Sequence, residues 1–79
     1  MKENAVTEEK LFAFVSKRLK EERQKKGYSN YEHLAYEIGI SRSQYGKYEN
    51  GGNMKLSTLL RILNHLEISF EEFFRSLNE

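Results

Sequence analysis

The stretch of residues 30–51 constrains the fold more than any other part of this chain, because it predicts two short helices joined by a tight turn. In the first helix, Leu34, Ala35 and Ile38 form an apolar stripe at the spacing of one helix face. Gly39, directly after this stripe, is the residue type that most often ends a helix. The chain is therefore expected to turn here and to start a second helix at once.

The second helix of this stretch has one apolar and one polar face. Ser41 is a favourable N-cap for it, and Tyr45 and Tyr48 share the side expected to face the core. The other side carries hydrogen-bond donors and acceptors from Arg42, Ser43, Gln44 and Lys47. Base edges and phosphates are recognised by this mixture of groups. A helix, a glycine turn and a capped helix with a polar face are typical of the helix-turn-helix that reads DNA.

The remaining sequence predicts further helices and no strand of useful length. Apolar residues recur three and four positions apart in the N-terminal third, and Gly27 is expected to end that helix. A leucine-rich pattern over about residues 56–66 predicts a central helix buried on several sides. Ser69 and Glu72 form a capping box, which predicts the start of a last helix.

A chain of 79 residues is sufficient for one small domain. We expect residues 1–7 to form a flexible N-terminal segment and residues 8–79 to form the helix-turn-helix DNA-binding domain. The predicted architecture is all-α, a compact five-helix bundle. Its helices are expected at about residues 8–26, 31–38, 42–50 and 56–66, and from Ser69 onward.

Charge is distributed unevenly, although the formal net charge is only +1. Residues 11–26 contain six basic and two acidic side chains, and residues 41–55 contain three basic and one acidic. Residues 67–79 contain one basic and four acidic side chains. One face of the domain can thus attract phosphates while another repels them. A solvated helical surface with mixed charges is the alternative explanation.

Several other classes of function have little support in the sequence. No nucleophile–histidine–acid arrangement, metal-ligand spacing or phosphate-binding glycine loop is present, so we expect no enzyme, no metal site and no cofactor. His33 and His65 have no ligand-spaced partners and are interpreted as isolated surface or rim residues. The first residues lack the apolar core of a signal peptide, and no apolar run approaches membrane-spanning length. We therefore expect a cytoplasmic, nucleoid-associated protein with no membrane partner.

Several motifs together match a known family. In chain order they are Arg23, Gly27, Leu34-Ala35, Gly39-Ile40-Ser41-Arg42-Ser43, Tyr48-Glu49-Asn50-Gly51 and Leu66-Glu67-Ile68-Ser69. With these motifs the chain resembles the Cro/repressor-type helix-turn-helix domains, or XRE family, over about residues 11–77. The resemblance implies a lambda-repressor-like fold and a transcriptional regulator that binds double-stranded DNA. The chain departs from the family's pattern at Tyr31, where Gln is frequent, and at Lys55, where a helix N-cap is frequent.

The family lays the first turn of its third helix in the major groove. This assigns the base contacts to Arg42, Ser43, Gln44 and Lys47. Arg can donate two hydrogen bonds to guanine, and Gln can pair in the same way with adenine. Gly46 would let this helix approach DNA closely, or is simply tolerated on the surface. Phosphate contacts are expected from helix ends and the polar side chains beside them, at Asn30, Tyr31, Ser41, Asn50 and Lys55.

Two further roles follow from the resemblance. Arg23 and Glu49 are expected to form a structural ion pair between the first and third helices. The last helix often supplies the dimer contact in this family, which makes its apolar face the candidate surface for a homodimer, with Phe70, Phe73, Phe74 and Leu77. The same surface would bind a toxin or another protein if the chain were an antitoxin-type or protein-interaction module. The polar row on the third helix favours a DNA-binding regulator, most simply a repressor, over this alternative.

Overall fold

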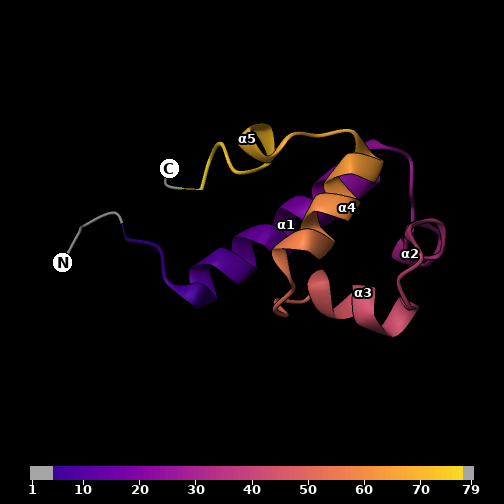
Figure 1. The fold of residues 1–79 in the computed structure, drawn as a ribbon, viewed down its shortest axis with the longest axis horizontal. Helices are drawn as coiled ribbons and strands as arrows, with labels where there is room; N and C mark the ends of the chain where they lie inside the picture. The colour runs from indigo at the N-terminus through magenta and orange to yellow at the C-terminus, as the bar shows by residue number, and fades with distance from the viewer. Residues whose placement is uncertain (1–4, 78–79) are drawn as a thin grey trace.

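The computed structural model describes residues 5–77, and in this part of the chain the regular elements are all helices (Figure 1). They are α1 (Glu8–Lys25), α2 (Tyr31–Ile38), α3 (Arg42–Tyr48), α4 (Leu56–Leu66) and α5 (Phe70–Phe73). The predicted all-α fold with five helices is therefore confirmed. Residues 1–4 of the expected N-terminal segment lie outside the described residues, and residues 5–7 precede α1.

The helices are arranged so that the helix-turn-helix lies at one end of the molecule. α4 crosses α1, while α2 and α3 lie together at the end away from the start of α1 (Figure 1). α5 lies against the side of α1, on the opposite side of the molecule from α3 (Figure 1). The radius of gyration of 12.6 Å is that of a compact small domain.

The starts of four helices are fixed by short polar side chains. The side-chain oxygens of Thr7, Asn30, Ser41 and Ser69 each accept a hydrogen bond from the backbone N–H three residues later. Each bond satisfies one of the N–H groups that a helix leaves without a partner in its first turn. α4 differs, because its N-cap residue is Lys55, whose side chain makes no capping bond.

The turn between α2 and α3 depends on the conformation of Gly39. This residue has φ of 81° and ψ of 30°, a left-handed conformation that costs little only for glycine. Its backbone N–H and that of Ile40 both donate to the carbonyl of Ala35. The last turn of α2 is thereby closed, and the chain is directed back so that α3 packs on α2.

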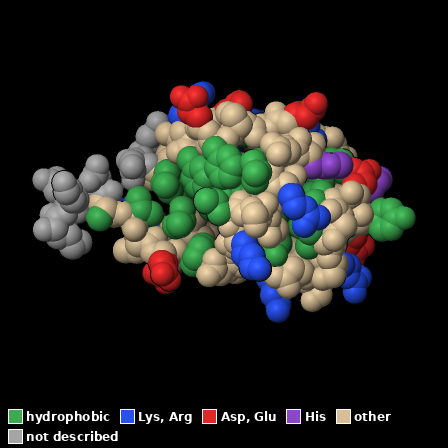
Figure 2. Space-filling model, in the orientation of Figure 1, with side chains coloured by type: hydrophobic (Ala, Val, Ile, Leu, Met, Phe, Trp, Pro, Cys, Tyr) green, Lys and Arg blue, Asp and Glu red, His purple; other side chains and the backbone are tan. Residues whose placement is uncertain are grey.

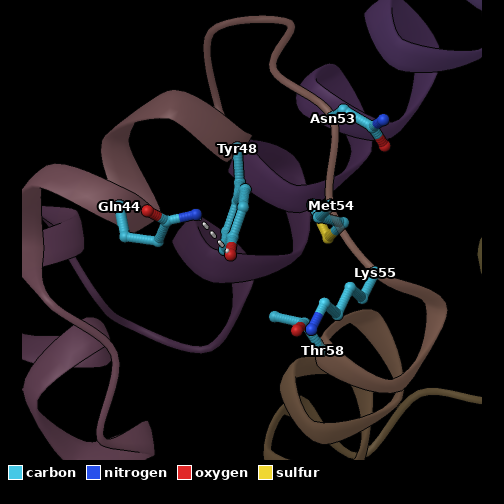
Figure 3. A pocket seen from close by; sticks show the side chains of 6 residues that line it. All are labelled: Gln44, Tyr48, Asn53, Met54, Lys55 and Thr58. Carbon is cyan, nitrogen blue, oxygen red and sulfur yellow. Dashed lines mark hydrogen bonds between the residues drawn. The ribbon is translucent and has the colours of Figure 1, made fainter.

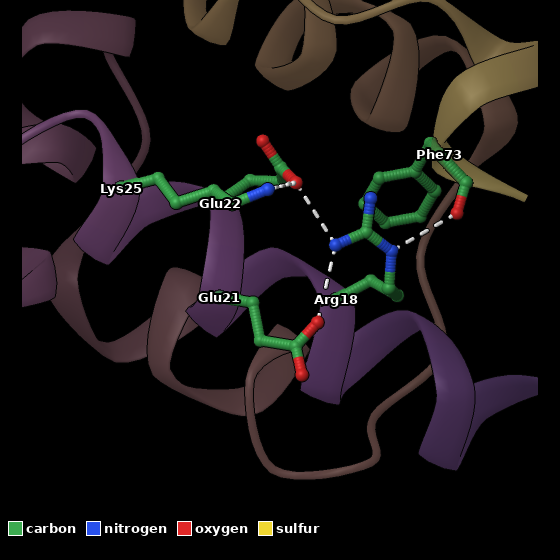
Figure 4. Close-up of polar contacts among 5 residues, drawn as sticks. All are labelled: Arg18, Glu21, Glu22, Lys25 and Phe73. Carbon is green, nitrogen blue, oxygen red and sulfur yellow. Dashed lines mark hydrogen bonds and ion pairs between the residues drawn. The ribbon is translucent and has the colours of Figure 1, made fainter.

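Two helices are shorter than predicted. α3 ends at Tyr48 and not at Asn50, because the backbone N–H groups of Asn50 and Gly52 both bond back to the carbonyl of Lys47 and close a turn there. α5 has only four residues. The helical pattern ends there, because the backbone N–H of Arg75 bonds to the carbonyl three residues back, that of Glu72. The carbonyl of Phe73 accepts a hydrogen bond from Nε of Arg18 on α1 at 3.2 Å (Figure 4).

Arg18 is the centre of the contact between α1 and α5. Its guanidinium lies over the ring of Phe73, 5.3 Å from the ring centroid, and its Nη1 pairs with Glu22 at 2.9 Å and with Glu21 at 3.1 Å (Figure 4). Glu22 also accepts a hydrogen bond from Lys25. This network holds α5 on α1 although α5 is only one turn long.

The core joins all five helices. Its largest fully buried side chains are Tyr45, Phe73, Leu19, Leu34, Ile62, Leu63 and Leu66. The helix at 56–66 was predicted to be buried on several sides. This is wrong for the N-terminal half of α4, where Leu56 and Leu60 are exposed, Leu56 by 72%. α4 therefore buries one stripe and leaves part of its apolar sequence in solvent.

Candidate nucleic-acid interface

α3 presents a polar side to solvent because its large apolar residues are used in the core. Tyr45 and Tyr48 are buried, so the helix cannot rotate without removing two aromatic rings from the core. The four side chains expected to contact bases all lie on the exposed side: Arg42, Ser43, Gln44 and Lys47. A row of donors and acceptors is thus carried by a helix whose orientation is fixed from behind.

Gln44 is held in place by a residue of its own helix. Its amide nitrogen donates a hydrogen bond of 2.9 Å to the hydroxyl of Tyr48, one turn further on (Figure 3). The two side chains line one wall of an open hollow of about 590 Å³ between α3 and the start of α4. Its other lining residues are Asn53, Met54, Lys55 and Thr58 (Figure 3). Asn53 and Thr58 were not among the residues predicted from the sequence, although both are polar and close to Lys55 in the chain.

The side chain of Arg42 forms an ion pair with Glu32 of α2. Its Nη1 lies 2.9 Å from Oε2 of Glu32, and the side chains are 71% and 56% exposed. Glu32 was also not predicted as a site residue, although an acid in the first turn of α2 and a base in the first turn of α3 hint at such a pair.

Most of the residues expected to contact phosphate already have a structural role. Asn30 and Ser41 are N-caps of α2 and α3, and both are exposed. The amide nitrogen of Asn50 donates a hydrogen bond to the carbonyl of Gly46 at 2.6 Å and so caps the C-terminal end of α3. Lys55 is exposed beside the first turn of α4, which has no capping side chain. The positive end of that helix and the ammonium group therefore act at the same place.

The side chain of Tyr31 explains why residue 46 is a glycine. The two interpretations made from the sequence, close approach to DNA and a tolerated surface position, were wrong. A Cβ atom at Gly46 would lie 2.8 Å from the hydroxyl oxygen of Tyr31 and 3.2 Å from its Cζ. The half-buried ring of Tyr31 also packs on that of Tyr45, with 5.7 Å between the ring centroids. Gly46 therefore makes room for a side chain of α2, and not for DNA.

The expected ion pair between Arg23 and Glu49 is present and buried. Nε and Nη2 of Arg23 donate to the two carboxylate oxygens of Glu49 at 2.8 and 3.2 Å, and each side chain is only 5% exposed. Nη1 of Arg23 donates to the backbone carbonyl of Tyr28 at 2.7 Å. One guanidinium thus ties the end of α3 and the α1–α2 loop to α1.

Tyr45 lies beside this ion pair. Burial, and then the Glu49 carboxylate, raise the pKa of Tyr45 above its ordinary value, so the phenol stays neutral. Its hydroxyl is buried and has no hydrogen-bond partner among the described residues.

The two histidines are exposed, but they are not isolated as predicted. Glu37 on α2 lies between them, 3.0 Å from Nε2 of His33 and 2.9 Å from Nε2 of His65 on α4. The hydroxyl of Tyr28 donates to the same carboxylate at 2.6 Å. Hydrogen bonds from Tyr28 and His65 hold the pKa of Glu37 below its ordinary value. This cluster ties α2 to α4, and no group arranged to hold a metal ion is present among the described residues.

The surface expected for a dimer or a partner needs one correction. Phe73 is fully buried and cannot belong to an interface. Phe70, Phe74 and Leu77 are half-buried, and the rings of Phe70 and Phe74 stack on each other. Figure 2 shows hydrophobic side chains gathered on the α5 side of the molecule, and Lys and Arg side chains nearer α3.

A family model described as helix-turn-helix matches residues 19–73. This region includes all of α2, α3, α4 and α5 and the C-terminal part of α1, so the chain belongs to the XRE family of helix-turn-helix proteins. The domains of this family bind DNA. No curated protein and no solved structure matches the chain. None of the described helices is long and apolar enough to cross a membrane.

Proposed function

We propose that this protein is a sequence-specific transcriptional regulator, most simply a repressor, that places α3 in the major groove of double-stranded DNA. The observation that carries the proposal is the exposed row on α3, fixed in direction by the buried Tyr45 and Tyr48. Within this row, Arg42 supplies a guanidinium fork suited to guanine and Gln44 an amide suited to adenine. Ser43 and Lys47 complete the base-facing set.

Phosphates on either side of the groove would be bound by helix ends and the side chains beside them. Asn30 and Ser41 lie at the N-terminal ends of α2 and α3, where backbone N–H groups point outward. Lys55 adds a cation at the start of α4, and Tyr31 and Asn50 are the remaining candidates for phosphate contacts. If about four phosphates per half-site are neutralised, log K should fall with log salt at a slope of about −3.6 per monomer.

We also propose that the regulator binds as a homodimer through the α5 side of the molecule. Phe70, Phe74 and Leu77 remain candidates for this contact, and the exposed Leu56 of α4, which lines an apolar hollow together with Phe74, extends the apolar surface. Two-fold pairing would place two copies of α3 about 34 Å apart, which matches a pseudo-palindrome one turn of DNA long. The same apolar surface is the observation that supports the second candidate, an antitoxin-type or protein-interaction module.

The test is selection of bound sequences from a random duplex pool at about 150 mM salt, where binding driven only by counterion release is weak. A palindromic consensus is expected, and its half-site spacing gives the dimer geometry. Weak binding without enrichment of any sequence would contradict the DNA-reading proposal. The second candidate would then be tested by a search for a protein partner of the α5 side.

A further inference from the structure

The ion pair between Glu32 and Arg42 lies within the surface proposed to meet DNA. Among the described residues it is the ion pair that joins α2 to α3, with 2.9 Å between Oε2 and Nη1. Both residues are in the first turns of their helices and both side chains are mostly exposed. A free carboxylate at this place would repel the phosphates of any bound nucleic acid. Its presence beside a base-facing arginine therefore calls for an explanation.

The pair limits what the arginine can do. A guanidinium has five N–H donors in one plane, and Glu32 uses one on Nη1. The donors on the edges that do not face Glu32 remain free, and two donors on one edge are what the O6 and N7 acceptors of guanine require. An arginine already held in one direction loses less side-chain freedom when it binds a base than a freely rotating one does.

We propose that Glu32 is a specificity-determining positioning residue, which orients the Arg42 fork toward a guanine and weakens contacts of Arg42 with phosphate. This inference rests on the proposed function, because it needs α3 in the major groove. Glu32 itself touches no base. It lowers affinity for DNA in general, because it adds a negative charge, and it raises the preference for one base over the others.

Two substitutions separate the charge of Glu32 from its positioning role. Glu32→Gln removes the charge and keeps the size, so it should strengthen binding to a scrambled duplex about 2- to 5-fold. It should also lower the preference for guanine at one position of the site by about 5-fold or more, since a good bidentate contact discriminates by about 5- to 150-fold. Glu32→Asp keeps the charge but withdraws the carboxylate. It should reduce the same preference and leave binding to the scrambled duplex unchanged.

The experiment measures dissociation constants for the selected duplex, for the duplex with the guanine replaced, and for a scrambled duplex. Glu9→Gln in the first turn of α1 is the matched control, because it removes the same charge from an exposed side chain at the end of α1 that lies away from α2 and α3. It should leave the base preference unchanged. Removal of the arginine with Arg42→Ala should abolish any effect of Glu32→Gln on base preference. Thermal melting of each variant verifies that the fold is retained.

Each outcome has one meaning. A selective wild-type protein together with Glu32 variants of unchanged base preference would overturn the inference and leave the proposed function intact. Equal loss of binding to all three duplexes would also overturn it, since a merely structural role predicts that pattern. A wild-type protein without any base preference would overturn the proposed function itself, and the inference with it.

Discussion

The buried pair of Arg23 and Glu49 allows a quantitative prediction about stability. Glu49→Ala removes both acceptors that face Nε and Nη2 of Arg23, and only the bond from Nη1 to the carbonyl of Tyr28 remains. Because each side chain is only 5% exposed, water cannot readily replace the lost carboxylate. The cost is therefore that of a buried charge without its partner, about 3–5 kcal/mol of unfolding free energy.

This loss is large compared with the stability of so small a domain, which is about 5 kcal/mol. For a domain of this length, each kcal/mol shifts the melting temperature by about 4–8 °C. We therefore expect Glu49→Ala to melt at least about 12 °C below the wild type, as measured by circular dichroism at 222 nm. Urea titration of the same samples gives the free energy directly. Glu49→Gln keeps a hydrogen-bond acceptor and should lose less.

The matched control is Glu21→Ala. Glu21 pairs with Arg18 at 3.1 Å but is 44% exposed, and Arg18 keeps its second partner, Glu22. A pair of this kind contributes about 0–1 kcal/mol, so the control should melt close to the wild type. If the free energy of unfolding of Glu49→Ala lies within about 1 kcal/mol of the wild-type value, the buried ion pair does not stabilise the fold and the prediction is wrong.

The remaining predictions concern Gly46, Tyr45 and Glu37. Gly46→Ala should cost about 1–3 kcal/mol because its Cβ would lie 2.8 Å from the hydroxyl of Tyr31, and the cost in urea titrations should shrink in a Tyr31→Phe background. Equal costs in both backgrounds would contradict this packing. Tyr45→Phe should raise the free energy of unfolding by about 1 kcal/mol, because it removes a buried hydroxyl without a partner; a destabilised variant would show that the hydroxyl is bonded. The pKa of Glu37 is lowered in the folded state, so its contribution is present above the ordinary carboxylate pKa and is lost as pH falls through the folded value. Glu37→Gln should therefore differ more from the wild type in urea titrations at pH 7 than at pH 3, and an equal difference would refute the assignment.

The helix starts could be predicted from the sequence because each depends on a few neighbouring residues. Asn30, Ser41 and Ser69 are short polar side chains directly before helical patterns, and all three cap their helices. The end of α5 could not be predicted in this way. The contact of Arg18 with the carbonyl of Phe73, which holds α5 on α1, joins residues 55 positions apart in sequence and could not be predicted either.

The candidate site shows the same division between local and long-range information. The exposed row on α3 follows from the helical period alone, because Tyr45 and Tyr48 fix which side is buried. The contacts of that row with other side chains depend on how α2 docks on α3. Glu32 is exposed, and the charge pattern alone could only hint at its pairing with Arg42, because the distance between them is set by the docking of the two helices. The choice of glycine at position 46 is explained only by Tyr31, because the hydroxyl of Tyr31 lies too close to the position that a Cβ atom there would take.

These contacts bear on how such a small domain could discriminate between DNA sequences. The two α3 side chains best suited to bidentate base contacts each have a partner within the protein, Glu32 for Arg42 and Tyr48 for Gln44. A partner that restricts a side chain reduces the number of bases and phosphates it can meet, and so lowers affinity for most sequences. It also reduces the ordering cost at the one sequence that fits. Affinity for DNA in general would then come from the helix ends and Lys55, and selectivity from Arg42 and Gln44. For this reason Glu32→Gln should lower the base preference while it raises the general affinity for DNA.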